Sequence, residues 1–328
     1  MSLEIKTSAL KPVRSTFANL ERRFGDKAAS RYQEASYDLQ PSANFHYRPI
    51  WQPQYELNDV RRTAIVMEDW YSLNDPRQYY YGSYVQVRAK MQETAESNYS
   101  FFEKRGLSRH LSDDVKAKLV RYLLPLRHVE HTANLNNVYA SAYGYGTTVT
   151  QAFMYEGVDR LGIAQYLSRI GLILDGNSGT SLAEAKAYWM DDPVWQGVRA
   201  YCEGTLVVSD WFEVAVAQNI VFDNLLCDLY YSQLDQWLDE NQAQDVGMLT
   251  EFMRIWYKDI SRWLDSLLKS VVAESAENKA QIEDWITAWR GKAIEALRPV
   301  ADEMLGAEAI EKSTLVLDAR LQRAGLFK

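Results

Sequence analysis

The chain contains 328 residues, of which 47% are apolar and 24% are charged, and its formal net charge is −8. This composition excludes a disordered chain and allows one large hydrophobic core or two modest ones. The negative charge argues against nucleic acid and anionic membranes as partners, because both attract basic surfaces.

Residues 1–55 are predicted to form an extended arm that wraps a partner. Pro49 and Pro53 exclude a helix interior here, since proline lacks the backbone donor that a helix needs. Four aromatic residues are all odd-numbered, so an extended chain would turn them to one side. They are Phe45, Tyr47, Trp51 and Tyr55. Because large rings are costly to leave in water, we expect them on a partner, or alternatively on the surface of their own domain.

Residues 56–328 are predicted to form a bundle of long helices. Apolar residues recur at helical spacing after Asp113, which we expect to cap a helix, and over 151–174, where turn residues follow. Further helices are expected over 210–237, 249–272 and 278–305.

The most apolar stretch, Val214–Tyr231, is predicted to be a buried helix, because five polar residues within it would be costly in lipid. They are Gln218, Asn219, Asp223, Asn224 and Asp228. The two cysteines, Cys202 and Cys227, form no C-x-x-C motif and fit a reducing compartment as buried thiols. Since residues 1–11 lack the apolar core of a signal peptide, we expect a cytoplasmic protein.

Motifs for phosphate cradles are absent: the chain has neither G-x-x-x-x-G-K-[ST] nor G-x-G-x-x-G. None of the four histidines, His46, His110, His128 and His131, follows a glutamate by three positions. Helical-bundle enzymes with two metals need a Glu-x-x-His pair on each of two helices. His128 and His131 share a helical face and could hold a metal, but we expect a structural role for both.

Several phrases of the sequence carry a family resemblance. They are RHVEHTA at 127–133, DRLGIAQ at 159–165, DWFE at 210–213 and NIVF at 219–222. These phrases resemble the β subunit of the hydroxylase in bacterial multicomponent di-iron monooxygenases. Two more, RYQEASYD at 31–38 and DPRQYYYG at 75–82, look closest to the phenol hydroxylase branch. The likeness covers essentially the whole chain.

The resemblance implies an all-α, ferritin-like helical bundle without metal; in this family a related α subunit holds the di-iron centre. Six residues then occupy degenerate ligand positions. They are Glu130, Arg160, Ile163, Glu213, Arg254 and Tyr257. Because a guanidinium cannot be deprotonated, Arg160 would place a permanent positive charge where a dication would sit. A buried glutamate without metal needs a counter-charge, so we predict that Glu130 pairs with Arg160 and Glu213 with Arg254.

The resemblance further implies a non-catalytic structural subunit of a phenol 2-monooxygenase-type complex, acting in aromatic hydrocarbon catabolism. Its partners would be α and γ subunits and a second β subunit in an (αβγ)2 heterohexamer, together with a regulatory protein and a reductase. No cofactor is expected in this chain; NADH, FAD and a 2Fe–2S cluster would act through the reductase. Two alternatives stay open: a self-sufficient helical metalloenzyme using His128 and His131, and a free-standing helical adaptor.

Overall fold

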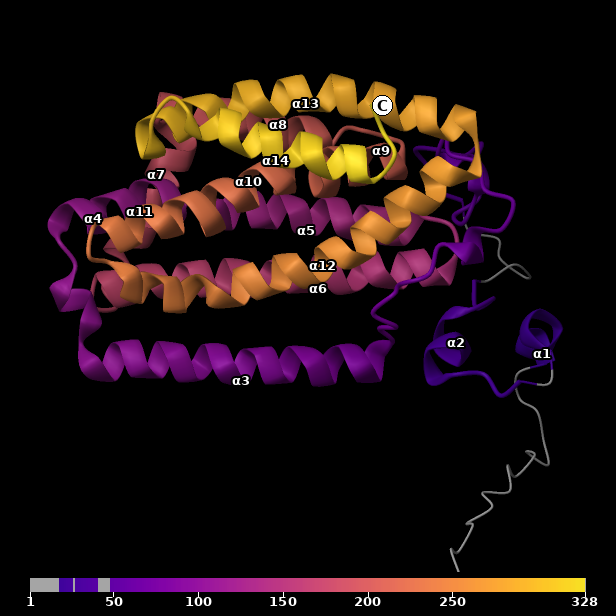
Figure 1. The fold of residues 1–328 in the computed structure, drawn as a ribbon, viewed down its shortest axis with the longest axis horizontal. Helices are drawn as coiled ribbons and strands as arrows, with labels where there is room; N and C mark the ends of the chain where they lie inside the picture. Colours follow the sequence, from indigo (N-terminus) through magenta and orange to yellow (C-terminus); the bar gives the residue numbers. More distant parts are fainter. Residues whose placement is uncertain (1–17, 26, 41–47, 328) are drawn as a thin grey trace, which may run out of the picture.

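The computed structural model describes residues 18–25, 27–40 and 48–327, in which helices predominate and no strand occurs. Most of the long helices run along the longest axis of the molecule (Figure 1). They include α3 (Tyr81–Arg105), α5 (Leu126–Tyr143), α6 (Thr147–Leu174), α12 (Gly247–Glu274), α13 (Ala276–Leu305) and α14 (Ala309–Arg323). The predicted all-α bundle is confirmed.

One further helix runs without interruption from Trp211 to Glu240 and changes its winding on the way. Its parts are α9 (Trp211–Ala215), the π-helical η5 (Val216–Phe222), α10 (Asp223–Asp228), the π-helical η6 (Leu229–Gln233) and α11 (Leu234–Glu240). Asp210 caps it, because its carboxylate accepts hydrogen bonds from the backbone N–H groups of Phe212 and Glu213 at 2.8 and 3.1 Å. This is the buried helix that the sequence predicts.

Shorter elements connect and cover the long ones. They are α4 (Asp113–Lys118), the π-helical η4 (Leu119–Leu123), α7 (Thr180–Asp191), α8 (Pro193–Thr205) and the 3₁₀ turns η1 (Val60–Arg62), η2 (Trp70–Ser72), η3 (Leu107–His110) and η7 (Gln244–Val246). The cap of α4 is Ser112 and not Asp113 as predicted, since Ser112 Oγ accepts from the backbone N–H of Val115 at 3.2 Å.

Four helices enclose the centre of the core: α5, α6, α12 and the composite helix α9–α11. In Figure 1, α12 and α10 lie in front of α6 and α5, with α13 and α14 above them and α3 below. Large apolar side chains fill the space between the helices. Those with no more than 1% exposure include Trp195, Trp211, Trp256, Trp263, Phe153 and Phe222. In the part of the chain described, none of the helices has the length and apolar character that a bilayer crossing requires.

The N-terminal segment contains two short helices, α1 (Ala18–Phe24) and α2 (Arg31–Ser36). The prediction of an extended chain is therefore wrong over these residues. The sequence carried a signal for α2: Ser30 and Gln33 form a capping box, in which each side chain accepts a hydrogen bond from the other residue's backbone. Tyr32 and Tyr37 then pack against Tyr71 of the main domain. A boundary at residue 55 and the wrapping of a partner remain predictions.

Candidate functional site

Charged side chains occupy the centre of the four-helix bundle. Arg160 of α6 is only 1% exposed there and contacts three carboxylates. Its Nη1 donates to Glu130 Oε2 of α5 at 3.2 Å, and its Nη2 donates to Glu156 Oε1 of α6 at 3.1 Å. Nη2 also donates to Asp223 Oδ2 at the start of α10. We call these four residues the Arg160 cluster.

The fourth helix contributes an aromatic face to this cluster. Trp256 of α12 stacks against Arg160, with 4.5 Å between the guanidinium carbon and the ring centroid. The face of an indole ring attracts a cation through its quadrupole. Trp256 Nε1 donates to Asp159 Oδ2 at 2.9 Å, which fixes the ring. All four helices of the bundle therefore meet at Arg160.

Side-chain amides hold the outer oxygens of two of the carboxylates. Asn219 Nδ2 donates to Glu156 Oε2 at 3.1 Å, and Gln218 Nε2 donates to Asp223 Oδ1 at 2.9 Å. Both amides lie on η5, whose π-helical winding brings residues five positions apart, such as Gln218 and Asp223, onto one side of the helix. Glu156 and Asp223 therefore have partners besides Arg160.

The cluster contains more acid than base. Burial raises the pKa of Glu130 and that of Glu156 to about 7, although the nearby Arg160 opposes the rise. Burial opposes the charge of Arg160 as well, but Asp223 and the two glutamates raise its pKa, so the guanidinium stays ionised. The two glutamates therefore titrate near neutral pH while the cation between them is permanent.

These residues do not fit a metal ion. Arg160 places a fixed positive charge between the carboxylates, and Ile163, one turn further on, is a buried apolar side chain. Over residues 18–25, 27–40 and 48–327, no group of three or more His, Cys, Asp or Glu residues is placed to hold a metal ion. Metal ligands must be neutral or anionic and must converge on one point. The cluster can form ion pairs inside the bundle, and its glutamates can bind and release protons there.

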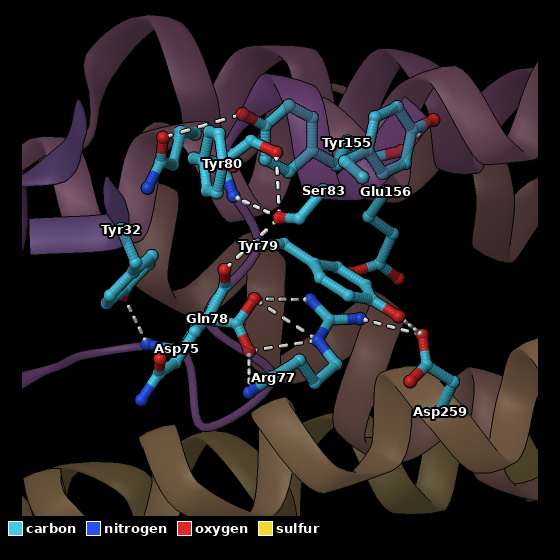
Figure 2. A network of polar contacts seen from close by, with 12 residues as sticks. Tyr32, Asp75, Arg77, Gln78, Tyr79, Tyr80, Ser83, Tyr155, Glu156 and Asp259 are labelled. Carbon is cyan, nitrogen blue, oxygen red and sulfur yellow. Dashed lines mark hydrogen bonds and ion pairs between the residues drawn. The ribbon is translucent and has the colours of Figure 1, made fainter. Parts of the chain in front are cut away.

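A second set of charged residues joins the bundle to the N-terminal segment (Figure 2). Arg77 donates to both carboxylate oxygens of Asp75 at 2.8 to 3.1 Å, and to Asp259 of α12 at 3.4 Å. Tyr79 also donates its hydroxyl to Asp259, at 3.1 Å. The backbone N–H of Asp75 donates to the hydroxyl of Tyr32 in α2 at 2.7 Å. This contact ties α2 to the main domain.

Arg88 of α3 connects these residues to the Arg160 cluster. Its Nε lies 3.0 Å from each carboxylate oxygen of Asp159, and its Nη2 lies 3.1 Å from Asp259. Asp159 is the acceptor that also fixes Trp256. We call Asp75, Arg77, Arg88, Asp159 and Asp259 the Arg88 network. Trp256 thus contacts both sets of charges.

The first of the two predicted ion pairs is confirmed and the second is wrong. Glu130 pairs with Arg160, as described above. Glu213 instead accepts a hydrogen bond from Trp289 Nε1 of α13 at 2.9 Å, so it faces away from the cluster. Arg254 is exposed and donates to Asp235 at 3.1 Å and to Glu251. Glu213 lies ten positions before Asp223, which is about 15 Å along a helix, so the carboxylate level with Arg160 is that of Asp223.

Tyr257, the other predicted position on α12, lies beside the cluster without contacting Arg160. Its hydroxyl accepts from Asn224 Nδ2 at 3.1 Å and from Arg320 Nη1 at 3.0 Å. The adjacent residue, Trp256, takes the inward place, so the predicted register on α12 is off by one residue.

The sequence prediction missed Glu156, Asp223 and Trp256. Glu156 precedes Arg160 by four positions, the spacing at which an acid and a base share a helix face. Asp223 is one of the five polar residues that interrupt Val214–Tyr231. Both signals were visible in the sequence, whereas nothing in it distinguished Trp256 from the chain's other tryptophans.

The histidines of α5 do not build a site with other ligands. His128 stacks on Trp189 with 5.5 Å between ring centroids, and burial lowers its pKa to about 4, so the imidazole is neutral. His131 is exposed. No third His, Cys, Asp or Glu joins them among the described residues.

Of the four aromatic residues proposed to contact a partner, Phe45 and Tyr47 lie outside the described residues. Trp51 is 66% exposed, as expected of a side chain that a partner covers. Tyr55 lies against the guanidinium groups of Arg61 and Arg62, at 5.4 and 5.3 Å from its ring centroid. Tyr55 thus has partners within its own chain.

The described helices form an all-α bundle that holds one guanidinium among three buried carboxylates at its centre. Residues 51–275 match the family model described as Methane/Phenol/Alkene Hydroxylase, and the chain belongs to this family.

Individual relatives narrow the similarity. The chain is 54% identical to the phenol 2-monooxygenase oxygenase component DmpL of Pseudomonas sp. (strain CF600), over 99% of this chain and 98% of that protein. It is 25% identical to the β subunit of the toluene-4-monooxygenase hydroxylase of Ectopseudomonas mendocina, over 96% and 97% of the two chains. The crystal structure of xenon-pressurised phenol hydroxylase from Pseudomonas sp. OX1 contains a chain that superposes with a TM-score of 0.94, at 50% identity and 98% coverage of both chains.

Proposed function

We propose that this chain is a non-catalytic structural β subunit of a phenol hydroxylase complex. The reaction, O2- and NADH-dependent hydroxylation of phenol-type aromatics, would take place at a di-iron site in the partner α subunit. The observation that carries this proposal is the position of Arg160, because a permanent cation at the bundle centre opposes metal binding there. The similarity to DmpL supports the phenol branch.

The complex would be an (αβγ)2 heterohexamer, with a regulatory protein and with a reductase that carries FAD and a 2Fe–2S cluster. The role of this chain would be to hold the helices of the α subunit rigid and to contribute to the dimeric core. The similarity to the β subunit of a toluene-4-monooxygenase hydroxylase supports a subunit role of this kind.

An uncharged surface on α5 and α6 supports an obligate partner. None of the exposed residues on these two helices, which are described in full, is Asp, Glu, Lys or Arg. Five of them are large and apolar, with exposed fractions of 36 to 50%: Leu135, Val138, Met154, Val158 and Leu161. Exposed apolar side chains without charged neighbours on the same helices are typical of a protein interface. We propose that the α subunit covers this face with apolar side chains. Charged residues of the α subunit placed opposite it would find no partner of opposite charge.

Reconstitution tests the function most simply. The chain would be expressed alone, and also together with candidate α and γ subunits, and each preparation would be assayed for iron and for phenol turnover with the reductase. We expect turnover and iron in the assembly only, and no turnover by this chain alone. Stoichiometric iron or turnover in the isolated chain would favour the metalloenzyme alternative, and a well-folded chain that binds neither subunit would favour the adaptor.

A matched pair of variants tests the surface. Val158→Lys puts a charge into the proposed interface and should weaken co-purification with the α subunit by roughly 100-fold, since an unpaired buried charge costs several kcal/mol. Leu315→Lys, on α14, is the control, because Leu315 is 69% exposed and lies on another helix. Equal co-purification of both variants would show that α5 and α6 face something else.

A further inference from the structure

The Arg160 cluster has the make-up of a cation site that the protein fills with its own side chain. Its carboxylates come from three elements, α5, α6 and α10, and none of them is more than 2% exposed. Water does not reach these oxygens in the folded chain, so only a bound cation or protons can offset their charge. The site is therefore defined by acceptors that converge on one buried position.

Two of the three acceptors, Glu156 and Asp223, have contacts that do not involve Arg160. Gln218, which donates to Asp223, accepts in turn from Asn136 Nδ2 of α5 at 2.9 Å. Asn219, which donates to Glu156, also lies 2.8 Å from Asn137 Oδ1. These amide contacts link the composite helix to α5 and α6, so Glu156 and Asp223 should stay in place when the guanidinium is removed.

The space between the acceptors suits a flat cation. The Trp256 ring forms one wall, stacked against the guanidinium and fixed by Asp159. The hydroxyl of Tyr231, which is 5% exposed and has no hydrogen-bond partner among the described residues, is near enough to Glu130 to be affected by its charge. It is a spare polar group at the edge of the cluster.

We propose that this cluster, once Arg160 is truncated, binds a planar guanidinium-type cation in preference to a compact ammonium or a divalent metal ion. A guanidinium presents several N–H donors in one plane and stacks on indole, as Arg160 does here. No group of three or more His, Cys, Asp or Glu residues among the described residues is placed to hold a metal ion, and the Trp256 ring that forms one wall offers a metal ion no ligand atom. This selectivity depends on the bundle core alone, so its failure would leave the subunit role untouched.

The experiment uses the full chain with Arg160→Ala. Ethylguanidinium supplies the atoms that this truncation removes, and ethylammonium and Mn²⁺ are the comparison cations. The midpoint of thermal unfolding would be recorded as each cation is raised to 20 mM. We expect ethylguanidinium at about twenty times its dissociation constant to raise the midpoint of the variant by roughly 2 to 3 °C. We expect no rise with ethylammonium or Mn²⁺, and none for the wild-type chain.

Two further variants make the result specific. Arg254→Ala also loses contacts with two carboxylates, but on the surface, and it should not respond to ethylguanidinium. Arg160→Ala combined with Glu130→Gln and Glu156→Gln should lose the response. If Arg160→Ala does not fold unaided, its refolding yield with and without ethylguanidinium replaces the midpoint. No gain in midpoint or yield, an equal gain for Arg254→Ala, or a larger gain with Mn²⁺ would overturn the assignment.

Discussion

The Arg160 cluster and the Arg88 network both bury guanidinium–carboxylate contacts, but they differ in charge balance and in access to water. The first sets one guanidinium against three carboxylates that are at most 2% exposed. The second sets two guanidinia against three carboxylates, and the side chains of Arg88 and Asp259 remain 11% and 17% exposed. Water and a second cation can relieve a lost contact in the network, whereas the cluster has neither. Burial should therefore decide how much each arginine contributes to the free energy of unfolding.

The largest effect should follow the loss of the cation at the bundle centre. Arg160→Met keeps most of the volume but leaves three buried carboxylates without their counter-charge. We expect the free energy of unfolding to fall by about 3–5 kcal/mol, as measured by urea denaturation. Stability equal to that of the wild type would mean that protons and packing replace the guanidinium fully.

A smaller effect should follow the loss of Arg88. In Arg88→Met, Asp259 keeps Arg77 and Asp159 keeps Trp256, so neither carboxylate is left without a partner. We expect a loss of roughly 1–3 kcal/mol in the same urea experiment. A loss as large as that of Arg160→Met would break the comparison, because partial exposure would then make no difference.

The cluster should also depend on pH. The folded-state pKa of Glu130 and of Glu156 is about 7, above the ordinary value of 4.5, so the folded chain holds protons that the unfolded chain releases. The stability that these groups contribute is complete below pH 4.5 and is lost as the pH rises to about 7, with a slope of at most roughly 1.4 kcal/mol per unit and group. Glu156→Gln should flatten this fall between pH 5 and 8. The same slope in both proteins would contradict the assignment.

The smallest effect should come from the loss of Arg254, which the sequence analysis paired with Glu213 but which lies on the surface. Arg254 contacts Asp235 and Glu251, but its side chain is 52% exposed, so water screens both contacts. Arg254→Met should change the free energy of unfolding by less than about 1 kcal/mol. A loss above about 2 kcal/mol would show that the exposure of an ion pair does not predict its contribution to the free energy of unfolding.

Local pattern was sufficient for much of the fold. Helical periodicity placed α6, α12 and α13 to within a few residues, because the apolar pattern of a long amphipathic helix repeats over many turns. The pair Glu130 and Arg160 could be predicted because the resemblance placed both residues at ligand positions of one site, where a buried carboxylate needs a counter-charge. Helix α2 has only six residues and is stabilised by a capping box and by packing near Tyr71, so periodicity could not reveal it.

The predicted site residues were wrong where the residue that faces Arg160 depends on how the helices pack. The π-helical turns of η5 and η6 change which residues of the composite helix face inward, and their positions follow from packing rather than from composition. The resemblance placed Glu213 at a ligand position, whereas in the fold it is Asp223, ten positions further along the composite helix, that contacts Arg160. On α12 the resemblance placed Arg254 and Tyr257 at ligand positions, whereas Trp256 is the residue that contacts Arg160.

Anomalous diffraction at the iron edge, from crystals of the assembled complex, tests the central claim most directly. We predict iron peaks in the partner α subunit, and in this chain continuous density for the Arg160 side chain among Glu130, Glu156 and Asp223 without an iron peak. An iron peak among those three carboxylates, with the Arg160 side chain turned away, would contradict the account.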